Sequence, residues 1–155
     1  MSRTGERGSV SIEVAVLAPA FIALMVLAGV VGRTAVAAEA IEAAAHDAAR
    51  AASISRDSVT AREAAREAIQ DQLDWHGLAC ANDLDPELTA TVGGAPTDFD
   101  DAFSSTIGTD ATVTVTLVCL VSFQDITLDI LPGMPDQRQI SATFTSPLDR
   151  YRGRQ

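Results

Sequence analysis

One uninterrupted apolar segment near the N-terminus constrains the fold of this chain more than any other feature. It runs from Val14 to Val31 without a charged or strongly polar side chain. At 1.5 Å per residue, a helix of this length spans roughly 27 Å, close to the roughly 30 Å hydrocarbon thickness of a bilayer. Arg3 and Arg7 precede the segment, which favours an N-terminus in the cytoplasm. The segment therefore predicts a single membrane-spanning helix, with the rest of the chain outside the cytoplasm.

A carboxylate lies directly before this apolar segment. An unpaired charge at membrane depth costs about 2.5–3.5 kcal/mol on insertion scales, so Glu13 needs a partner. Cleavage between Gly8 and Ser9 would create a new α-amino group at Ser9 and make Glu13 the fifth residue of the mature chain. Residues four apart share one face of a helix. We expect Glu13 to neutralise this amine, or the same amine of a neighbouring subunit during assembly.

These residues resemble the N-terminus of class III type IV prepilins, and most of all the TadE-like pseudopilins or minor pilins of tight-adherence (Flp) pilus systems. Gly8, Ser9, Glu13 and Pro19 match that pattern, with Gly at the cut, the acid, and an early Pro in the apolar helix. The resemblance implies cleavage after Gly8 by a prepilin peptidase and a single-pass protein of the cell membrane. It also implies contacts with other pilin subunits and support for assembly of an adhesive filament.

Two further features of the membrane helix bear on packing. Pro19 removes one helical hydrogen bond and is expected to kink the helix. Ala28 and Gly32 are small and four residues apart, which permits close contact between membrane helices. The predicted parts of the chain are a basic leader (1–8), the transmembrane helix (9–33), Ala-rich extracytoplasmic helices (34–79) and a small β region (80–155).

The membrane helix is expected to continue outward, because Ala is the strongest helix former and dominates the sequence after Arg33. Its polar residues recur at spacings of three and four, as in a solvated helix face. These residues are Glu39, Glu42, His46 and Arg50, opposite Ile41, Ala45, Ala48 and Ala52. His46 beside Asp47 lacks a second ligand cluster, so a metal or acid–base site is not expected.

A second amphipathic helix is expected to follow a break at residues 53–58. Thr60 and Glu63 fit a capping box that would start it, and it would reach about His76. Its expected buried face consists of Ala65, Ile69, Leu73 and His76. Trp75 is expected to close the helix against the β region.

Alternating apolar residues predict strands in the remainder of the chain. The segment 88–92 forms a short strand ended by Gly93 and Gly94, and residues 112–123 form the clearest one. The expected inward side chains of the latter are Val113, Val115, Leu117, Cys119, Val121 and Phe123. Further strands are expected at 126–130 and 140–144. The predicted fold is α+β: a long N-terminal helix, a second helix, and an antiparallel sheet of three to four strands packed on the helix.

The two cysteines are placed for a bond between helix and sheet. Cys80 follows the second helix, and Cys119 lies on the inward face of the clearest strand. A disulfide between them would close a loop of about 39 residues and contribute about 3–4 kcal/mol in the chain-entropy model. Two buried free thiols are the alternative.

Charge and motif content exclude several function classes. A net charge of −10 argues against nucleic acid as a partner, since phosphate binding requires clustered cations. No nucleophile elbow, phosphate-binding loop or zinc spacing is present, so we expect neither an enzyme nor a cofactor or metal site. Asp98, Asp100 and Asp101 lack EF-hand spacing and are expected to belong to a solvated acidic loop between Gly93 and Asp110.

Alternatives to the pilin interpretation remain at this stage. Signal peptidase could release a secreted, disulfide-linked binding module after Ala37. The chain could also be an ordinary membrane anchor whose Glu13 side chain reaches water, with lipid as the partner of its apolar helix. A pseudopilin of a secretion or DNA-uptake machine would share the same N-terminus.

Overall fold

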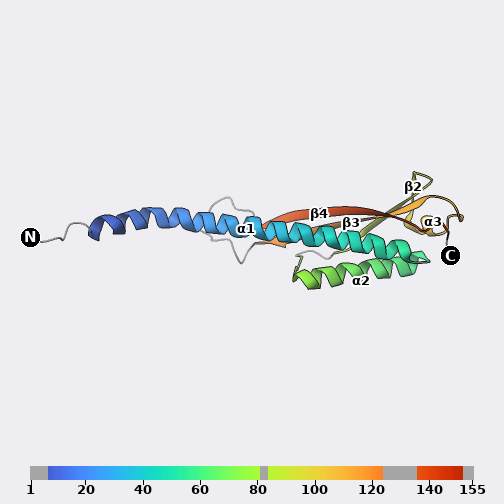
Figure 1. Cartoon of the computed structure of the whole chain (residues 1–155), viewed down its shortest axis with the longest axis horizontal. Helices are drawn as coiled ribbons and strands as arrows, with labels where there is room; N and C mark the ends of the chain where they lie inside the picture. Colours follow the sequence, from blue (N-terminus) through green and yellow to red (C-terminus); the bar gives the residue numbers. More distant parts are fainter. Residues whose placement is uncertain (1–6, 81–83, 124–135, 152–155) are drawn as a thin grey trace, which may run out of the picture.

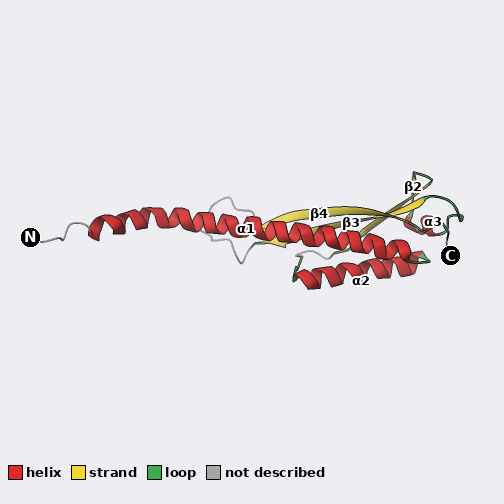
Figure 2. Ribbon diagram, viewed as in Figure 1, coloured by secondary structure: helices red, strands yellow, loops and turns green. Residues whose placement is uncertain are grey.

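The architecture comes from a computed structural model, which describes residues 7–80, 84–123 and 136–151, with side chains from Glu13 onward. The described residues confirm the α+β class (Figures 1 and 2). In chain order, the elements are α1 (Arg7–Ile54), α2 (Ser58–His76), β1 (Glu87–Val92), β2 (Ala95–Thr97), α3 (Phe99–Phe103), β3 (Ala111–Ser122) and β4 (Gln137–Pro147).

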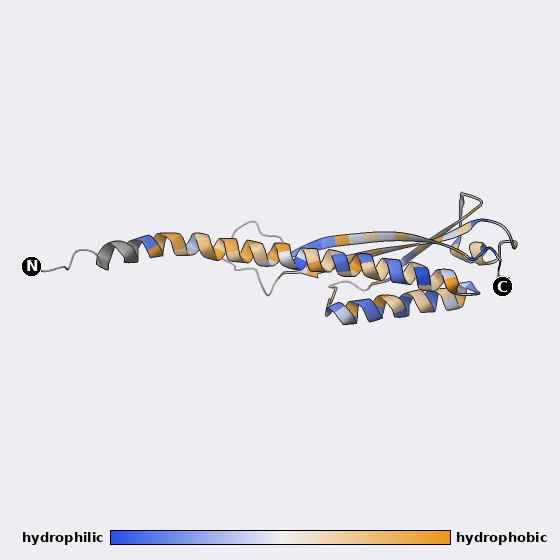
Figure 3. Cartoon of the chain, viewed as in Figure 1, coloured by the Kyte–Doolittle hydropathy of each residue, from blue (hydrophilic) through white to orange (hydrophobic). Residues whose placement is uncertain are grey.

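Helix α1 is one continuous helix of 48 residues, or about 72 Å long. Its first half extends away from the rest of the molecule as a stalk, and its second half lies alongside α2 and the sheet (Figure 1). The stalk carries the apolar segment, whereas polar side chains alternate with apolar ones farther along the helix (Figure 3). The predicted continuation of the apolar helix beyond Arg33 is therefore confirmed.

The turn between the two long helices has an N-cap that sequence analysis placed wrongly. The carboxylate of Asp57 accepts hydrogen bonds from the main-chain N–H and the hydroxyl of Thr60, both at 2.8 Å. Helix α2 therefore begins at Ser58, and Thr60 lies within its first turn instead of capping it. Asp was overlooked because the capping-box pattern requires Ser or Thr followed by Glu or Gln.

Helix α2 ends at His76, as predicted. Gly77 adopts a left-handed φ of 59°, and the N–H of Leu78 bonds to the carbonyl of Leu73 at 2.9 Å. This arrangement satisfies the last carbonyls of the helix and turns the chain toward Cys80.

The four strands form one antiparallel sheet in the order β2-β1-β3-β4. Gly93 and Gly94, with φ values of 61° and 83°, form the two-residue turn that pairs Val92 with Ala95. Positive φ at both positions explains why glycine is needed there. Strands β3 and β4 pair along their whole length, from Thr112 opposite Pro147 to Ser122 opposite Gln137.

The core lies between one face of this sheet and the second half of α1. All six inward residues predicted for β3 are buried: Val113, Val115, Leu117, Cys119, Val121 and Phe123. Helix α1 contacts the sheet through β3 and β4, and α2 packs against α1. The buried hydroxyl of Ser146 on β4 donates to that of Ser53 on α1 at 2.9 Å, which satisfies both groups.

The structure corrects three further expectations. Trp75 is 84% exposed and does not close α2 against the sheet, and His76 is also exposed. The expected acidic loop contains β2 and α3, with Phe99 and Phe103 buried. Those two rings lie one helical turn apart, which makes the segment amphipathic rather than solvated. The expected strand at 126–130 lies outside the described residues.

Candidate functional site: an apolar stalk joined to a disulfide-linked domain

The first half of α1 exposes large apolar side chains along its length. From Glu13 to Val36 no residue is buried, and Phe21 and Met25 are 63% and 76% exposed. Within the described residues, α1 is the one helix long and apolar enough to cross a membrane. Water is a poor surrounding for such a surface, so a bilayer or other helices must cover it.

The predicted cleavage and assembly residues lie at the start of this stalk. Gly8 and Ser9 belong to the first turn of α1, of which the structure describes the backbone alone. Glu13 is exposed at the beginning of the apolar segment. The helix continues through the exposed Pro19, and the kink expected there stays a prediction.

Ala28 and Gly32 are both exposed on the stalk. A methyl group added at Gly32 would have no neighbouring atom within 4 Å in this single chain. The surface around Gly32 is therefore open to another helix, and its use in packing stays a prediction.

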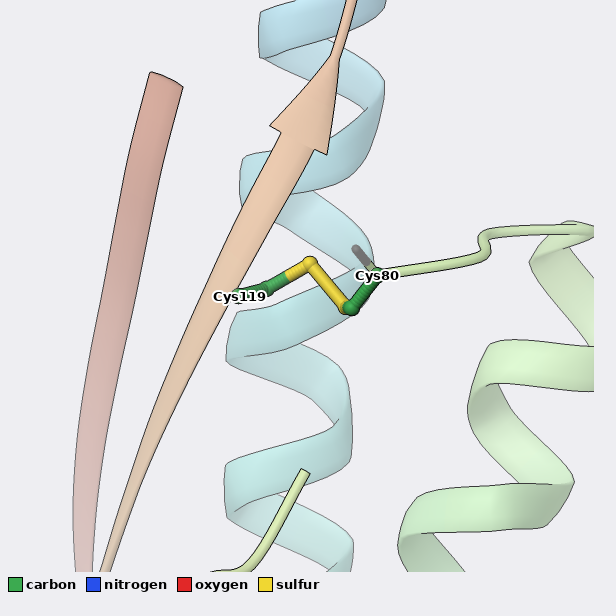
Figure 4. Close-up of a disulfide and its surroundings, with 2 residues drawn as sticks. All are labelled: Cys80 and Cys119. Carbon is green, nitrogen blue, oxygen red and sulfur yellow. A yellow bond between two sulfur atoms is a disulfide. The ribbon is translucent and has the colours of Figure 1, made fainter. Parts of the chain in front are cut away.

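The disulfide expected from the sequence joins Cys80 and Cys119, with their Cα atoms 5.3 Å apart (Figure 4). Cys119 points from β3 into the core, and Cys80 is half-buried in the segment that follows α2. The bond therefore links the exit of the second helix to the middle of the sheet. Because most buried side chains of α1 and α2 are alanines, this covalent link adds to a core that contains few large groups.

An arginine of α2 connects this helix to α3. Arg62 lies 3.1 Å from Asp100 and stacks 4.6 Å from the ring centre of Phe99. A hydrogen bond from the Ser58 hydroxyl, followed by the effect of Arg62, lowers the pKa of Asp100 below its ordinary value. Asp98 and Asp101 of the same acidic cluster are exposed. The cluster therefore positions α3 against α2, a structural role.

The polar stripe of α1 is exposed, as predicted, and the face opposite it is buried. Nδ1 of His46 lies 3.0 Å from Asp47, and its ring meets that of Phe144 edge to face with centroids 4.4 Å apart. Gln72 donates a hydrogen bond to the same Asp47 carboxylate. Among the residues that the structure describes, no three potential metal ligands converge, here or elsewhere.

Comparison with known proteins agrees with the resemblance read from the N-terminus. Residues 8–50 match a family model described as TadE-like protein. No curated protein and no solved structure matched the chain. The matched segment begins at the predicted cleavage glycine and ends near the end of α1, so it contains the whole exposed stalk. Together, the match and the apolar helix support a pilin-like membrane protein.

Proposed function

We propose, from the match of residues 8–50 to TadE-like proteins, that this chain is a minor pilin or pseudopilin that supports assembly of a tight-adherence pilus. The stalk anchors the protein in the cell membrane, with its N-terminus in the cytoplasm and the disulfide-linked domain outside. The observation that carries the proposal is the uncovered apolar half of α1, which continues rigidly into the folded domain.

The proposed processing step creates the charge that Glu13 requires. A prepilin peptidase hydrolyses the peptide bond between Gly8 and Ser9, which releases the leader carboxylate and leaves a free amine on Ser9. This amine and Glu13 lie one helical turn apart, and pairing removes the cost of a lone carboxylate near the hydrocarbon. The same amine of an adjacent subunit serves equally well, so pairing aligns neighbouring stalks.

Release by signal peptidase after Ala37 is disfavoured on physical grounds. Ala37 is 1% exposed and lies in the interior of α1, where its methyl group contacts the core. The released product would begin at residue 38 and lack Ala37, which would leave its place in the core empty.

Intact mass of the protein extracted from membranes tests the processing step. We expect a chain that begins at Ser9 and retains the disulfide. A product that begins at residue 38 and is found in the culture fluid would support the secreted module. An uncut chain in the membrane would support an ordinary anchor, and either result contradicts the proposal.

A substitution at Glu13 tests the assembly role separately. Glu13→Ala should leave cleavage and membrane insertion intact but lower incorporation into sheared surface filaments by about tenfold or more, because the amine loses its partner. Glu63→Ala is the matched control, since Glu63 is exposed on α2 outside the stalk. Equal incorporation of the Glu13 variant and the wild type would refute the pairing.

A further inference from the structure

The two edges of the sheet differ in length and in chemistry. Strand β2 forms one edge with three residues, one of which is Pro96. Strand β4 forms the other edge with eleven residues, and its single charged side chain is Arg138. The charge and the one proline of β4 lie at its ends, because Arg138 is its second residue and Pro147 its last. Residues 139–146 carry neither, and long edges of this kind invite pairing with another strand.

The ladder between β3 and β4 shows which main-chain groups face outward. At its two ends, the N–H of Phe123 bonds to the carbonyl of Asp136, and the N–H of Leu148 to that of Ala111, both at 2.9 Å. Hydrogen-bonded pairs alternate in an antiparallel ladder, so the even-numbered residues of β4 bond to β3. The outward residues are Gln137, Gln139, Ser141, Thr143, Thr145 and Pro147, all exposed. In the part of the chain that the structure describes, no hydrogen bond covers the outward N–H groups of residues 137–145.

Strand β2, by contrast, is closed to pairing. The N–H of Gly93 bonds to the carbonyl of Asp110, so alternation in β1 directs Val92 and Ala90 toward Ala95 and Thr97. Pro96 is then the residue of β2 that faces outward, and it has no N–H to donate.

A groove follows the open edge, and we call it the α1–β4 groove. It consists of three adjoining hollows of about 390, 290 and 450 Å³ between α1 and β4. The first two share Ala38 and Ile140, and the last two share Glu42. Half-buried Ile140, Ala142 and Phe144 form its apolar floor. The groove is therefore open beside the same strand whose main chain is uncovered.

A second copy of this chain fits the edge poorly. Strand β4 begins beside Val31 and Ala38 and ends at the bond between Ser146 and Ser53, so it runs in the direction of α1. Antiparallel pairing of two β4 edges would point the two stalks in opposite directions, which excludes anchorage in one membrane; this step rests on the proposed function. Side-by-side pairing of β4 with β2 of another copy would place β4 against the outward Pro96, which has no N–H to donate.

The charge of the groove restricts the partner further. Arg138 lines the first hollow, whereas Glu39 and Glu42 line the other two, so the negative charge lies toward the far end of the groove. Both glutamates are exposed, and no ion pair formed by either is found among the described residues. A basic side chain entering from the open side would lie beside them. We propose that the edge of β4 accepts an extended segment of another protein as an added strand, with an Arg or Lys directed at Glu39 and Glu42.

A peptide-binding experiment on the full, disulfide-bonded chain in detergent micelles tests this proposal. The probe is a synthetic peptide of alternating Thr and Val with one central Arg. We expect the amides of Gln139, Ser141 and Thr143 to exchange freely in the chain alone and to slow by about tenfold or more with the peptide. The amides of Ile140 and Ala142, which bond to β3, serve as internal references and should be protected throughout.

Matched variants separate the main-chain contribution from the charge contribution. Thr143→Pro and Thr143→Ala both lose the hydroxyl contact with Thr116 of β3, but only the Pro variant also loses the outward N–H. The Pro variant should abolish binding, whereas the Ala variant should bind as the wild type does. A peptide with Glu in place of Arg should bind about tenfold more weakly at low salt. Glu42→Gln should reduce this difference in affinity between the two peptides. An unchanged far-ultraviolet circular dichroism spectrum establishes that the Pro variant is folded.

Three outcomes would overturn the proposal. One is protection of the outward amides in the chain alone, whether by its own residues or by a second copy, and molecular mass identifies the second copy. The others are equal binding of both peptides and equal binding by the Pro and Ala variants. None of these measurements depends on cleavage after Gly8 or on filament formation, so failure here is distinguishable from failure of the proposed function.

Discussion

The two halves of α1 belong to one continuous helix, but the first exposes large apolar side chains and the second buries small ones. In the first half, large residues such as Leu24 and Met25 are 61% and 76% exposed. In the second half, the fully buried positions include Ala44 and Ala48, whose side chains are single methyl groups. Hydrophobic character alone therefore does not identify the core of this protein.

The difference follows from what each half contacts. In the second half, α1 lies between α2 and the sheet, and small side chains let these neighbours approach closely. In the first half only Val30, at its end, packs against the core of the described chain, so the large side chains before it remain available for lipid or other stalks. Packing in the domain thus depends on close approach of backbones, together with the large residues of β3 and the disulfide.

Removal of the disulfide should affect the second half most strongly. The double substitution Cys80→Ser with Cys119→Ser should lower the free energy of unfolding of the domain by about 3–4 kcal/mol, because the loop is no longer closed in the unfolded chain. Urea titration in micelles, followed by circular dichroism, measures this loss. Reduction of the wild-type protein should reproduce it, and an unchanged midpoint would show that the core is stable without the bond.

Replacing one alanine in each half of α1 by leucine tests directly whether the two halves differ in packing. Ala48→Leu should cost about 1–3 kcal/mol, since α2 and the sheet leave no space for the larger side chain. Ala20→Leu, at an exposed position of the stalk, should change stability by less than about 0.5 kcal/mol. Equal effects in chemical unfolding experiments would mean that the two halves do not differ in packing.

The cap at Asp57 should produce the smallest effect, visible as a dependence on pH. The hydrogen bond from the Thr60 main-chain N–H lowers the pKa of Asp57 in the folded protein. A carboxyl group whose pKa is lower in the folded than in the unfolded chain stabilises the folded protein at pH values above its ordinary pKa. That contribution is lost as the pH falls below about 4.

The matched variant Asp57→Asn retains a capping side chain without an ionisable group. Comparing its unfolding midpoint with that of the wild type from neutral to acid pH isolates Asp57, because Asp100, whose pKa is also lowered, is common to both proteins. Parallel curves for the two proteins would exclude a contribution from the cap charge.

Several features were predictable because they depend on local pattern. The apolar stalk, the solvated stripe of α1 and the alternation of β3 each follow from the period of a helix or a strand. The disulfide also followed, since periodicity placed Cys119 on the inward face of β3 and Cys80 came soon after the end of the second helix.

Other features depend on which distant segments of the chain fold beside them. Trp75 lies on α2, but whether anything covers it depends on where the sheet ends. Phe99 and Phe103 belong to the acidic segment 98–103, and their burial depends on β1, β3 and α2 lying beside them. The N-cap at Asp57 was missed because the capping-box pattern requires Ser or Thr followed three residues later by Glu or Gln.

The sequence by itself determined which segments are helical or extended, which faces are apolar, and where a stalk leaves the domain, because these depend on side chains near one another along the chain. Only the tertiary structure decided that alanines form the helical side of the core, and that β4 is an open edge beside an acidic groove. Burial and edge position are properties of neighbours brought together by folding, and no periodicity within one element specifies them.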